Sequence, residues 1–137
     1  QYEQFPGGLV SPHAIRAHYY TSVTGDEMKL REVNEALRKL AFEPKVFKKS
    51  QNRKSKGVDI SLTKDFLGHA FLNNYDFVVL IAGDADYLPL VEEVKRLGKI
   101  VYLTFLSNGL SQELRLAADW FGSLDKLFLE RWRPNEK

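Results

Sequence analysis

One stretch of six residues constrains the fold more than any other part of the chain. Residues 77–82 read FVVLIA, apolar and largely β-branched without a break, which indicates a strand covered on both faces. A second run of this kind, IVYLTFL at residues 100–106, follows a segment at 87–97 with apolar residues at helical spacing. Strand, helix and strand in this order form a βαβ unit with parallel pairing. We therefore expect an α/β protein, with a mostly parallel central sheet flanked by helices.

The rest of the chain continues the same alternation. Aromatic and β-branched residues predict a strand at 14–21, and helical spacing predicts a helix at 27–41 that Pro44 ends. A short strand at 45–48, a helix at 58–73, a fourth helix reaching Phe121 and a last strand at 127–129 follow. We find no repeat and expect one domain at residues 14–130, between a flexible N-terminal segment at 1–13 and a C-terminal tail at 131–137.

Composition excludes several classes of function. The 137 residues include no cysteine, which excludes disulfides, zinc–thiolate sites and thiol nucleophiles. No GxSxG, GxGxxG or Walker A motif is present in the sequence, so acyl transfer and nucleotide-cofactor chemistry lack their usual signals. No apolar run approaches the roughly 20 residues of a membrane span, and we expect a cytoplasmic protein.

Acidic residues gather where ligands bind in sheets of this kind, beyond the carboxyl ends of the strands. Asp84 and Asp86 follow the run at 77–82, and Asp59 opens the helix that follows a strand and a basic loop. Neighbouring carboxylates repel unless a cation or a proton neutralises them, and Mg²⁺ binds one or two carboxylates together with water and phosphate oxygens. These three acids are candidate ligands for Mg²⁺ or Mn²⁺ and candidate catalytic residues. Alternatively, Asp84 only caps the next helix and Asp86 only favours its dipole.

Basic residues precede Asp59 in one twelve-residue window. Arg53, Lys54 and Lys56 are candidate contacts to RNA phosphates, although a solvated surface loop would have the same composition. Asp65 comes six residues after Asp59, about 240° further around a helix, so we expect it beside the site and not in it. Asp119 and Ser111 are further candidates for such a supporting position, with Ser111 also the expected cap of the fourth helix.

Three segments together resemble the NYN domain family, a PIN-like group of metal-dependent ribonucleases. They are KGVD at 56–59 with Leu62 and Asp65, the YD at 75–76 followed by LIAGDADY at 80–87, and a closing part with Gly98, Lys99, Ser111 and Asp119. The resemblance covers residues 14–127. It implies a PIN-like three-layer sandwich and metal-dependent cleavage of RNA. It also implies that Asp59, Asp84 and Asp86 are motif acids, whereas Asp65 and Asp119 match recurring acids of less defined role.

The resemblance departs from the family pattern at the beginning of the chain. The family opens with an apolar strand ending in a D-G-x-N type motif, which supplies a metal-binding aspartate and a central strand, and residues 1–12 contain nothing similar. A sheet without that strand leaves rows of backbone groups unpaired, at about 1–3 kcal/mol for each buried group. We expect the native gene to encode the segment. The alternatives are that an additional domain or a second copy supplies the strand, or that the protein does without it. We also expect this chain alone to be a poor nuclease.

The leading hypothesis is an endoribonuclease that hydrolyses phosphodiester bonds with Mg²⁺ or Mn²⁺. The alternative is a non-catalytic NYN module that binds RNA or a protein and has an incomplete active site. A receiver domain phosphorylated on aspartate would share the acids and the α/β fold. It would need a lysine after a late strand, where residues 106–108 read LSN.

Overall fold

The structure is a computed structural model that describes residues 16–49 and 56–125. The chain divides into two compact units, and the boundary lies between Leu62 and Thr63. The helices and strands are β1 (Ala17–Val23), α1 (Glu27–Lys39), β2 (Phe42–Lys48), α2 (Lys56–Phe71), β3 (Phe77–Ile81), the 3₁₀ helix η1 (Ala85–Tyr87), α3 (Leu88–Arg96), β4 (Ile100–Phe105), α4 (Gln112–Ala117) and β5 (Trp120–Ser123). The described strands form two sheets, in the orders β1-β2 and β3-β4-β5, and every strand pair is parallel. The predicted α/β class with parallel strands is confirmed.

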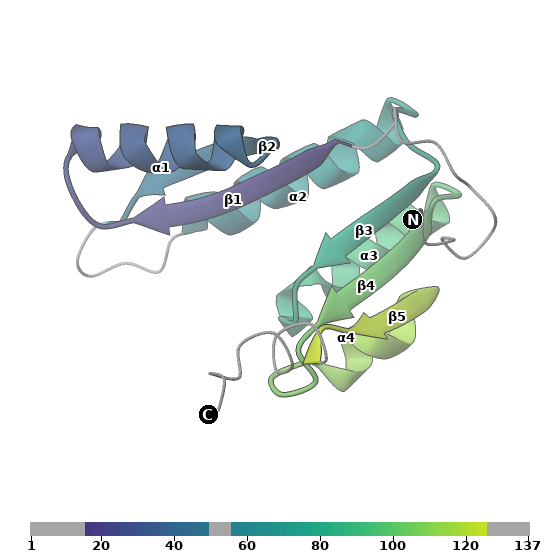
Figure 1. The fold of residues 1–137 in the computed structure, drawn as a ribbon. Helices are drawn as coiled ribbons and strands as arrows, with labels where there is room; N and C mark the ends of the chain where they lie inside the picture. Colours follow the sequence, from purple (N-terminus) through teal and green to yellow (C-terminus); the bar gives the residue numbers. More distant parts are fainter. Residues whose placement is uncertain (1–15, 50–55, 126–137) are drawn as a thin grey trace, which may run out of the picture. The chain divides into compact units, whose positions relative to one another are not determined.

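The first unit is built on one parallel strand pair joined by α1 (Figure 1). Asp26 begins α1 by accepting a hydrogen bond from the Lys29 backbone amide over 3.0 Å. Across the sheet, the rings of Tyr19 and Phe42 meet edge to face with centroids 5.4 Å apart. The two strands pair in parallel, with Ala17 opposite Phe42, so the carboxyl ends of β1 and β2 lie on the same side of the sheet.

The end of α1 differs from the prediction. The helix ends at Lys39, and Ala41 takes a left-handed conformation with φ of 66°, so β2 begins at Phe42. Pro44 therefore lies inside β2, opposite Tyr19, and does not end the helix. Proline is tolerated there because each strand of a two-stranded sheet has one edge that needs no ladder hydrogen bond.

The second unit has its three strands side by side, with α3 and α4 on one face (Figure 1). On that face the strands contribute Leu80, Val101 and Leu103, all at most 3% exposed. The helices contribute Val91, Val94 and Leu114, which are fully buried. Each such side chain contributes roughly 1.5–3 kcal/mol by leaving water. This core holds the strand ends that carry the acidic turn.

The opposite face of the same sheet is apolar and exposed. Val79, Ile81, Ile100 and Trp120 retain 40%, 64%, 43% and 51% of their accessible surface. The continuous apolar sequence of β3 predicted a strand covered on both faces, and the exposure of Val79 and Ile81 departs from that expectation.

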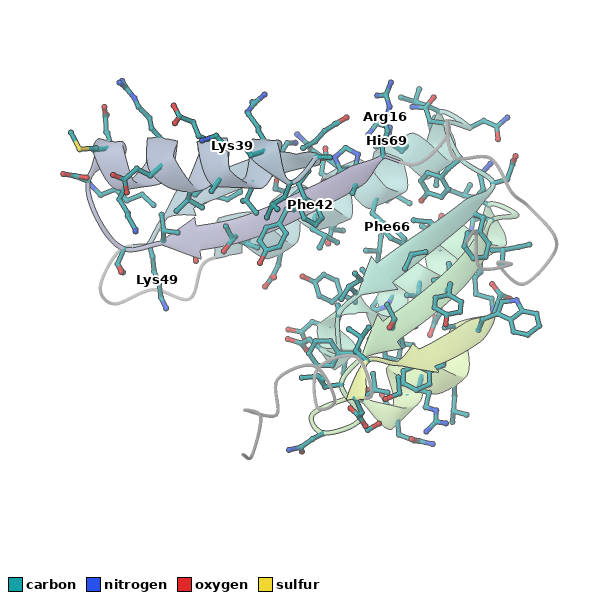
Figure 2. All side chains as sticks on the ribbon, viewed as in Figure 1. Arg16, Lys39, Phe42, Lys49, Phe66 and His69 are labelled. Atoms are coloured by element: carbon teal, nitrogen blue, oxygen red, sulfur yellow. The ribbon has the colours of Figure 1, made fainter. Side chains whose placement is uncertain are left out.

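The approach from α2 to β3 is fixed by one aromatic pair in the second unit. Phe66 of α2, labelled in Figure 2, meets Tyr75 edge to face with ring centroids 6.1 Å apart. The Tyr75 hydroxyl donates to the Phe66 carbonyl oxygen over 2.5 Å. Burial raises the pKa of the Tyr75 hydroxyl above its ordinary value.

The last part of the described chain corrects the prediction of a long fourth helix. α4 spans only Gln112–Ala117, and Phe121 belongs to β5, which pairs with β4. Ala118 is already extended, with ψ of 152°, because Asp119 bonds to the start of β4. The strand expected at 127–129 lies outside the described residues. Among residues 16–49 and 56–125, no helix has the length and apolar character to cross a bilayer.

Candidate functional site

The carboxyl ends of the three strands in the second unit lie at one edge of the sheet (Figure 1). β3 leads into Gly83 and Asp84, β4 into a loop at residues 106–111, and β5 into Asp125. Since open parallel sheets bind ligands beyond this edge, its side chains are the first candidates for a site.

Asp84 and Asp86 lie on the turn between β3 and α3, and both are exposed. One oxygen of the Asp84 carboxylate accepts a hydrogen bond from the Asp86 backbone amide over 2.9 Å, and this begins η1. Asp84 therefore caps η1 and not the third helix as the alternative expected, because α3 begins after Tyr87 without a side-chain cap. Capping uses one carboxylate oxygen, so it is compatible with ion binding through the other.

Gly83 holds this turn against the loop that follows β4. A β-carbon at position 83 would lie 2.3 Å from Cδ1 of Phe105 and 3.2 Å from the carbonyl oxygen of Gly109. The Ser111 backbone amide donates to the Gly83 carbonyl oxygen over 2.9 Å. Only a residue without a side chain fits this close approach.

Ser111 lies beside the turn and caps α4, as the sequence predicted. Its hydroxyl accepts a hydrogen bond from the Leu114 amide over 3.3 Å. Its own backbone amide reaches Gly83, so Ser111 joins the start of α4 to the acidic turn.

The donor set of this turn fits a hard divalent cation held partly by water. Two carboxylates two residues apart, together with water and a substrate phosphate, are the usual ligands of Mg²⁺. Among residues 16–49 and 56–125, no group of three or more His, Cys, Asp or Glu side chains could hold a metal ion. On this turn, Asp84 and Asp86 could hold such an ion together with water and substrate oxygens.

Asp59 is exposed in the first turn of α2, where the helix dipole favours a carboxylate. It belongs to the first unit, in which Gly57 lies against the Phe47 ring of β2, with a β-carbon position 3.4 Å from Cδ1. Lys48 and Lys49 at the end of β2 are exposed as well. The grouping of Asp59 with Asp84 and Asp86 rests on the sequence motifs.

The two other predicted acids have separate surroundings. Asp65 of α2 is largely buried, with its side chain 16% exposed and a carboxylate oxygen 3.9 Å from the Lys64 ammonium. Asp119 lies at the amino ends of β4 and β5, where it accepts from the Val101 amide over 2.8 Å and lies 3.5 Å from the Lys95 ammonium. Asp84 and Asp86 are at the carboxyl ends, so the structure does not bring Asp119 to their turn.

The predicted RNA contacts fall mostly beyond the described part of the chain. Arg53 and Lys54 lie outside the described residues. Lys56 is the first residue of α2, and its side chain is likewise not described. Their role stays a prediction.

Sequence reasoning missed one carboxylate at the carboxyl edge. Asp125 accepts a hydrogen bond from the Ser107 amide over 2.9 Å, and its own amide donates to the Ser123 hydroxyl over 3.1 Å. Hydrogen bonds from Ser107 and Ser123 hold the pKa of Asp125 below its usual range. The available signal was the spacing of Ser123 and Asp125, which is hidden when the fourth helix is taken to reach Phe121.

Comparisons with known proteins agree with these observations. The chain matches the family model described as NYN domain over residues 3–125. It is also similar to the crystal structure of a protein of unknown function from Vibrio parahaemolyticus RIMD 2210633, with 28% sequence identity and a TM-score of 0.60. That likeness covers 81% of this chain and 69% of the other. A comparison with curated proteins gives no match.

The family match accounts for the parallel strands and for the position of the GDAD turn after β3. NYN domains generally bind RNA, and PIN-like nucleases of this kind generally depend on divalent metal ions. The family model matches most of the sequence, including both acidic motifs. This chain therefore belongs to the NYN domain family.

Proposed function

We propose that the chain is a metal-dependent endoribonuclease that hydrolyses phosphodiester bonds in RNA. The observation that carries this proposal is the exposed pair Asp84 and Asp86 on the turn after β3, in a chain of the NYN family. The Gly83 carbonyl oxygen accepts from the Ser111 amide and Asp84 caps η1, so these bonds would position the two carboxylates before substrate arrives.

In this proposal Asp84 and Asp86 hold Mg²⁺ or Mn²⁺, and Asp59 is the third acid. A bound divalent ion would lower the pKa of a water molecule and neutralise charge at phosphorus. Asp84 would contribute the oxygen that does not cap η1, and its backbone bond to Asp86 would keep the two carboxylates in a fixed relation. Ser111 would support the turn through its hydrogen bond to Gly83. The largely buried Asp65 of α2 would be a second supporting residue beside the site.

Phosphate contacts would come from the basic segment that leads into α2. Arg53, Lys54 and Lys56 supply three cations within four residues, just before Asp59 in the sequence. Such contacts position a nucleic acid without reading its bases. We therefore expect weak sequence preference and affinity that falls with added salt.

The test is cleavage of end-labelled single-stranded RNA with Mg²⁺ or Mn²⁺, comparing the parent with Asp84→Asn. Asparagine keeps an oxygen that can cap η1 but removes the charge, so the fold should persist while cleavage is lost. Asp86→Asn and Asp59→Asn test the other two acids separately. Glu92→Gln is the matched control because it removes one exposed carboxylate from α3, away from the turn.

The expected result is cleavage by the parent and by Glu92→Gln that EDTA abolishes and Mn²⁺ restores. Equal cleavage by the parent and by Asp84→Asn would instead point to a contaminating nuclease and would contradict the proposal. Failure of Asp59→Asn to reduce cleavage would remove only that residue from the site.

A second candidate is a non-catalytic module that binds RNA. The exposed Lys48 and Lys49 at the end of β2 support this candidate, because such cations can hold RNA phosphates without a metal ion. RNA binding without cleavage under either metal, weakened by charge reversal in Lys54→Glu and Lys56→Glu, would support it. Loss of binding in those variants together with metal-dependent cleavage by the parent would support the nuclease.

A further inference from the structure

The end of β5 is tied to the loop that follows β4 by a small polar network. The Asp125 carboxylate accepts from the Ser107 amide over 2.9 Å, and the hydroxyl oxygens of Ser107 and Ser123 lie 3.2 Å apart. The Ser123 hydroxyl also accepts from the Asp125 amide over 3.1 Å. Ser107 is therefore held from two sides, by a carboxylate and by a hydroxyl.

The other end of the same loop is tied to the acidic turn. The Ser111 amide donates to the Gly83 carbonyl oxygen over 2.9 Å, and the Gly109 carbonyl oxygen lies 3.2 Å from where a β-carbon of Gly83 would stand. The loop at residues 106–111 thus runs between two anchors, Asp125 at its start and Gly83 at its end.

Asp84, the residue after Gly83, is hydrogen-bonded to the residues that follow it. The Asp84 side chain accepts from the Asp86 amide over 2.9 Å, and its carbonyl oxygen accepts from the Tyr87 amide over 3.1 Å. A shift of the loop would move Gly83, and a shift of Gly83 would move both carboxylates together.

We propose that Asp125 is a positioning residue for Asp84 and Asp86, acting through the loop at 106–111. The proposal rests on the nuclease or metal-binding function of those two acids. Asp125 does not act as a direct ligand in this arrangement, because β4 lies between β3 and β5 and places their ends roughly 10 Å apart. Its carboxylate serves as a fixed acceptor for Ser107.

The low pKa of Asp125 agrees with this role. The hydrogen bonds from Ser107 keep the carboxylate ionised near neutral pH, and a charged acceptor forms stronger hydrogen bonds than a neutral one. The network should therefore hold the loop firmly under the conditions in which a divalent ion would bind.

A graded set of variants tests the proposal. Asp125→Ala removes the acceptor, Asp125→Asn keeps one neutral acceptor oxygen, and Ser107→Ala removes a hydroxyl but keeps the amide donor. Glu92→Ala controls for loss of an exposed carboxylate elsewhere in the same unit. The first readout is the amide NMR signals of Asp84, Ala85 and Asp86 without metal, and the second is the Mn²⁺ dependence of RNA cleavage.

We expect the three amide signals to shift in Asp125→Ala, less in Asp125→Asn, and not in Glu92→Ala. We expect the Mn²⁺ concentration for half-maximal cleavage to rise about 10-fold in Asp125→Ala, as for residues that orient metal ligands, while the KM for RNA stays the same. If Asp125→Asn partly restored the parent's amide signals and Mn²⁺ dependence, the acceptor oxygen at position 125 would be the feature that positions the turn.

Unchanged amide signals in Asp125→Ala would overturn the proposal, whether or not the chain cleaves RNA. A lower melting temperature with unchanged Mn²⁺ dependence would also overturn it, because Asp125 would then only stabilise the fold. Shifted signals in a chain that never cleaves RNA would support the positioning role and count against the nuclease function instead.

Discussion

The ring of Phe105 lies against the α-carbon of Gly83, so close that a β-carbon there would be 2.3 Å from Cδ1 of the ring. This contact joins the end of β4 to the turn that carries Asp84. It makes the acidic turn part of the packed second unit, although Asp84 and Asp86 are themselves exposed.

Substitution Gly83→Ala should destabilise the chain by about 1–3 kcal/mol, because the added methyl group displaces the Phe105 ring. Urea unfolding followed by circular dichroism measures this change. Gly68→Ala is the matched control: apart from its chain neighbours and the nearby backbone of α2, no atom lies within 4 Å of its β-carbon position, and alanine there should stabilise by about 0.5–1 kcal/mol. Partial recovery in the double variant Gly83→Ala, Phe105→Leu would locate the strain at the ring. Equal stability of Gly83→Ala and the parent would contradict the contact.

Capping and charge at Asp84 can be separated by two substitutions. Asp84→Ala should lower the free energy of unfolding by about 0.5–2 kcal/mol, because the Asp86 amide loses its acceptor. Asp84→Asn should have the same free energy of unfolding as the parent. It should nevertheless lose cleavage and any rise in melting temperature on addition of Mn²⁺. Thermal unfolding with and without Mn²⁺ checks both statements. A Mn²⁺ response of Asp84→Asn equal to that of the parent would show that the ion binds elsewhere.

Asp119 should matter for stability and not for cleavage. Asp119→Ala leaves the Val101 amide without its side-chain acceptor, at a cost of about 1–3 kcal/mol, whereas Asp119→Asn keeps an acceptor oxygen. Lys95→Met should cost less, because the Lys95–Asp119 pair is partly exposed and such pairs contribute about 0–1 kcal/mol. Urea unfolding of the single and double variants measures the coupling. If a fully folded Asp119→Asn variant lost cleavage, Asp119 would have a role in the reaction and this prediction would be wrong.

The stability contributed by Asp125 should depend on pH in the acid range. Its pKa in the folded chain lies below the ordinary value of 3.8, because Ser107 and Ser123 donate to the charged form. The stability that Asp125 contributes is therefore fully present above pH 3.8, and it is lost as the pH falls through the lower pKa of the folded state. The difference in unfolding free energy between the parent and Asp125→Asn should be constant near neutral pH and shrink in acid. If this difference in unfolding free energy grew in acid instead, the predicted lowering of the Asp125 pKa would be contradicted.

The sequence predicted the elements that depend on local pattern and missed those that depend on distant pairing. β3, β4 and α1 begin at the residues where the predictions begin, and Ser111 caps α4 as expected. Phe121 sits at helical spacing from Leu114 but becomes strand, because β4 offers hydrogen bonds that a local pattern does not reveal.

For the candidate site, the sequence predicts which acids follow β3 but not how the surrounding carboxylates are arranged. The GDAD turn follows the parallel strand β3, which the apolar run and the fold class together imply, although only one face of that strand is buried. The sequence does not predict the role of Asp125 because that role depends on the position of β5, and it places Asp119 near the site because the expected fourth helix is too long. In both cases the error in position follows from the error at the end of α4.

The parallel pairing has a consequence for the kinetics of folding. β1 and β2 are separated by α1, β3 and β4 by α3, and β4 and β5 by α4, so none of these paired strands is joined by a hairpin. A strand can meet its partner only after the intervening segment has closed into a loop, which costs entropy before any ladder forms. During that interval the apolar segments Phe77–Ile81 and Ile100–Phe105 remain unpaired. Refolding at low protein concentration should therefore recover more of the native chain than refolding at high concentration.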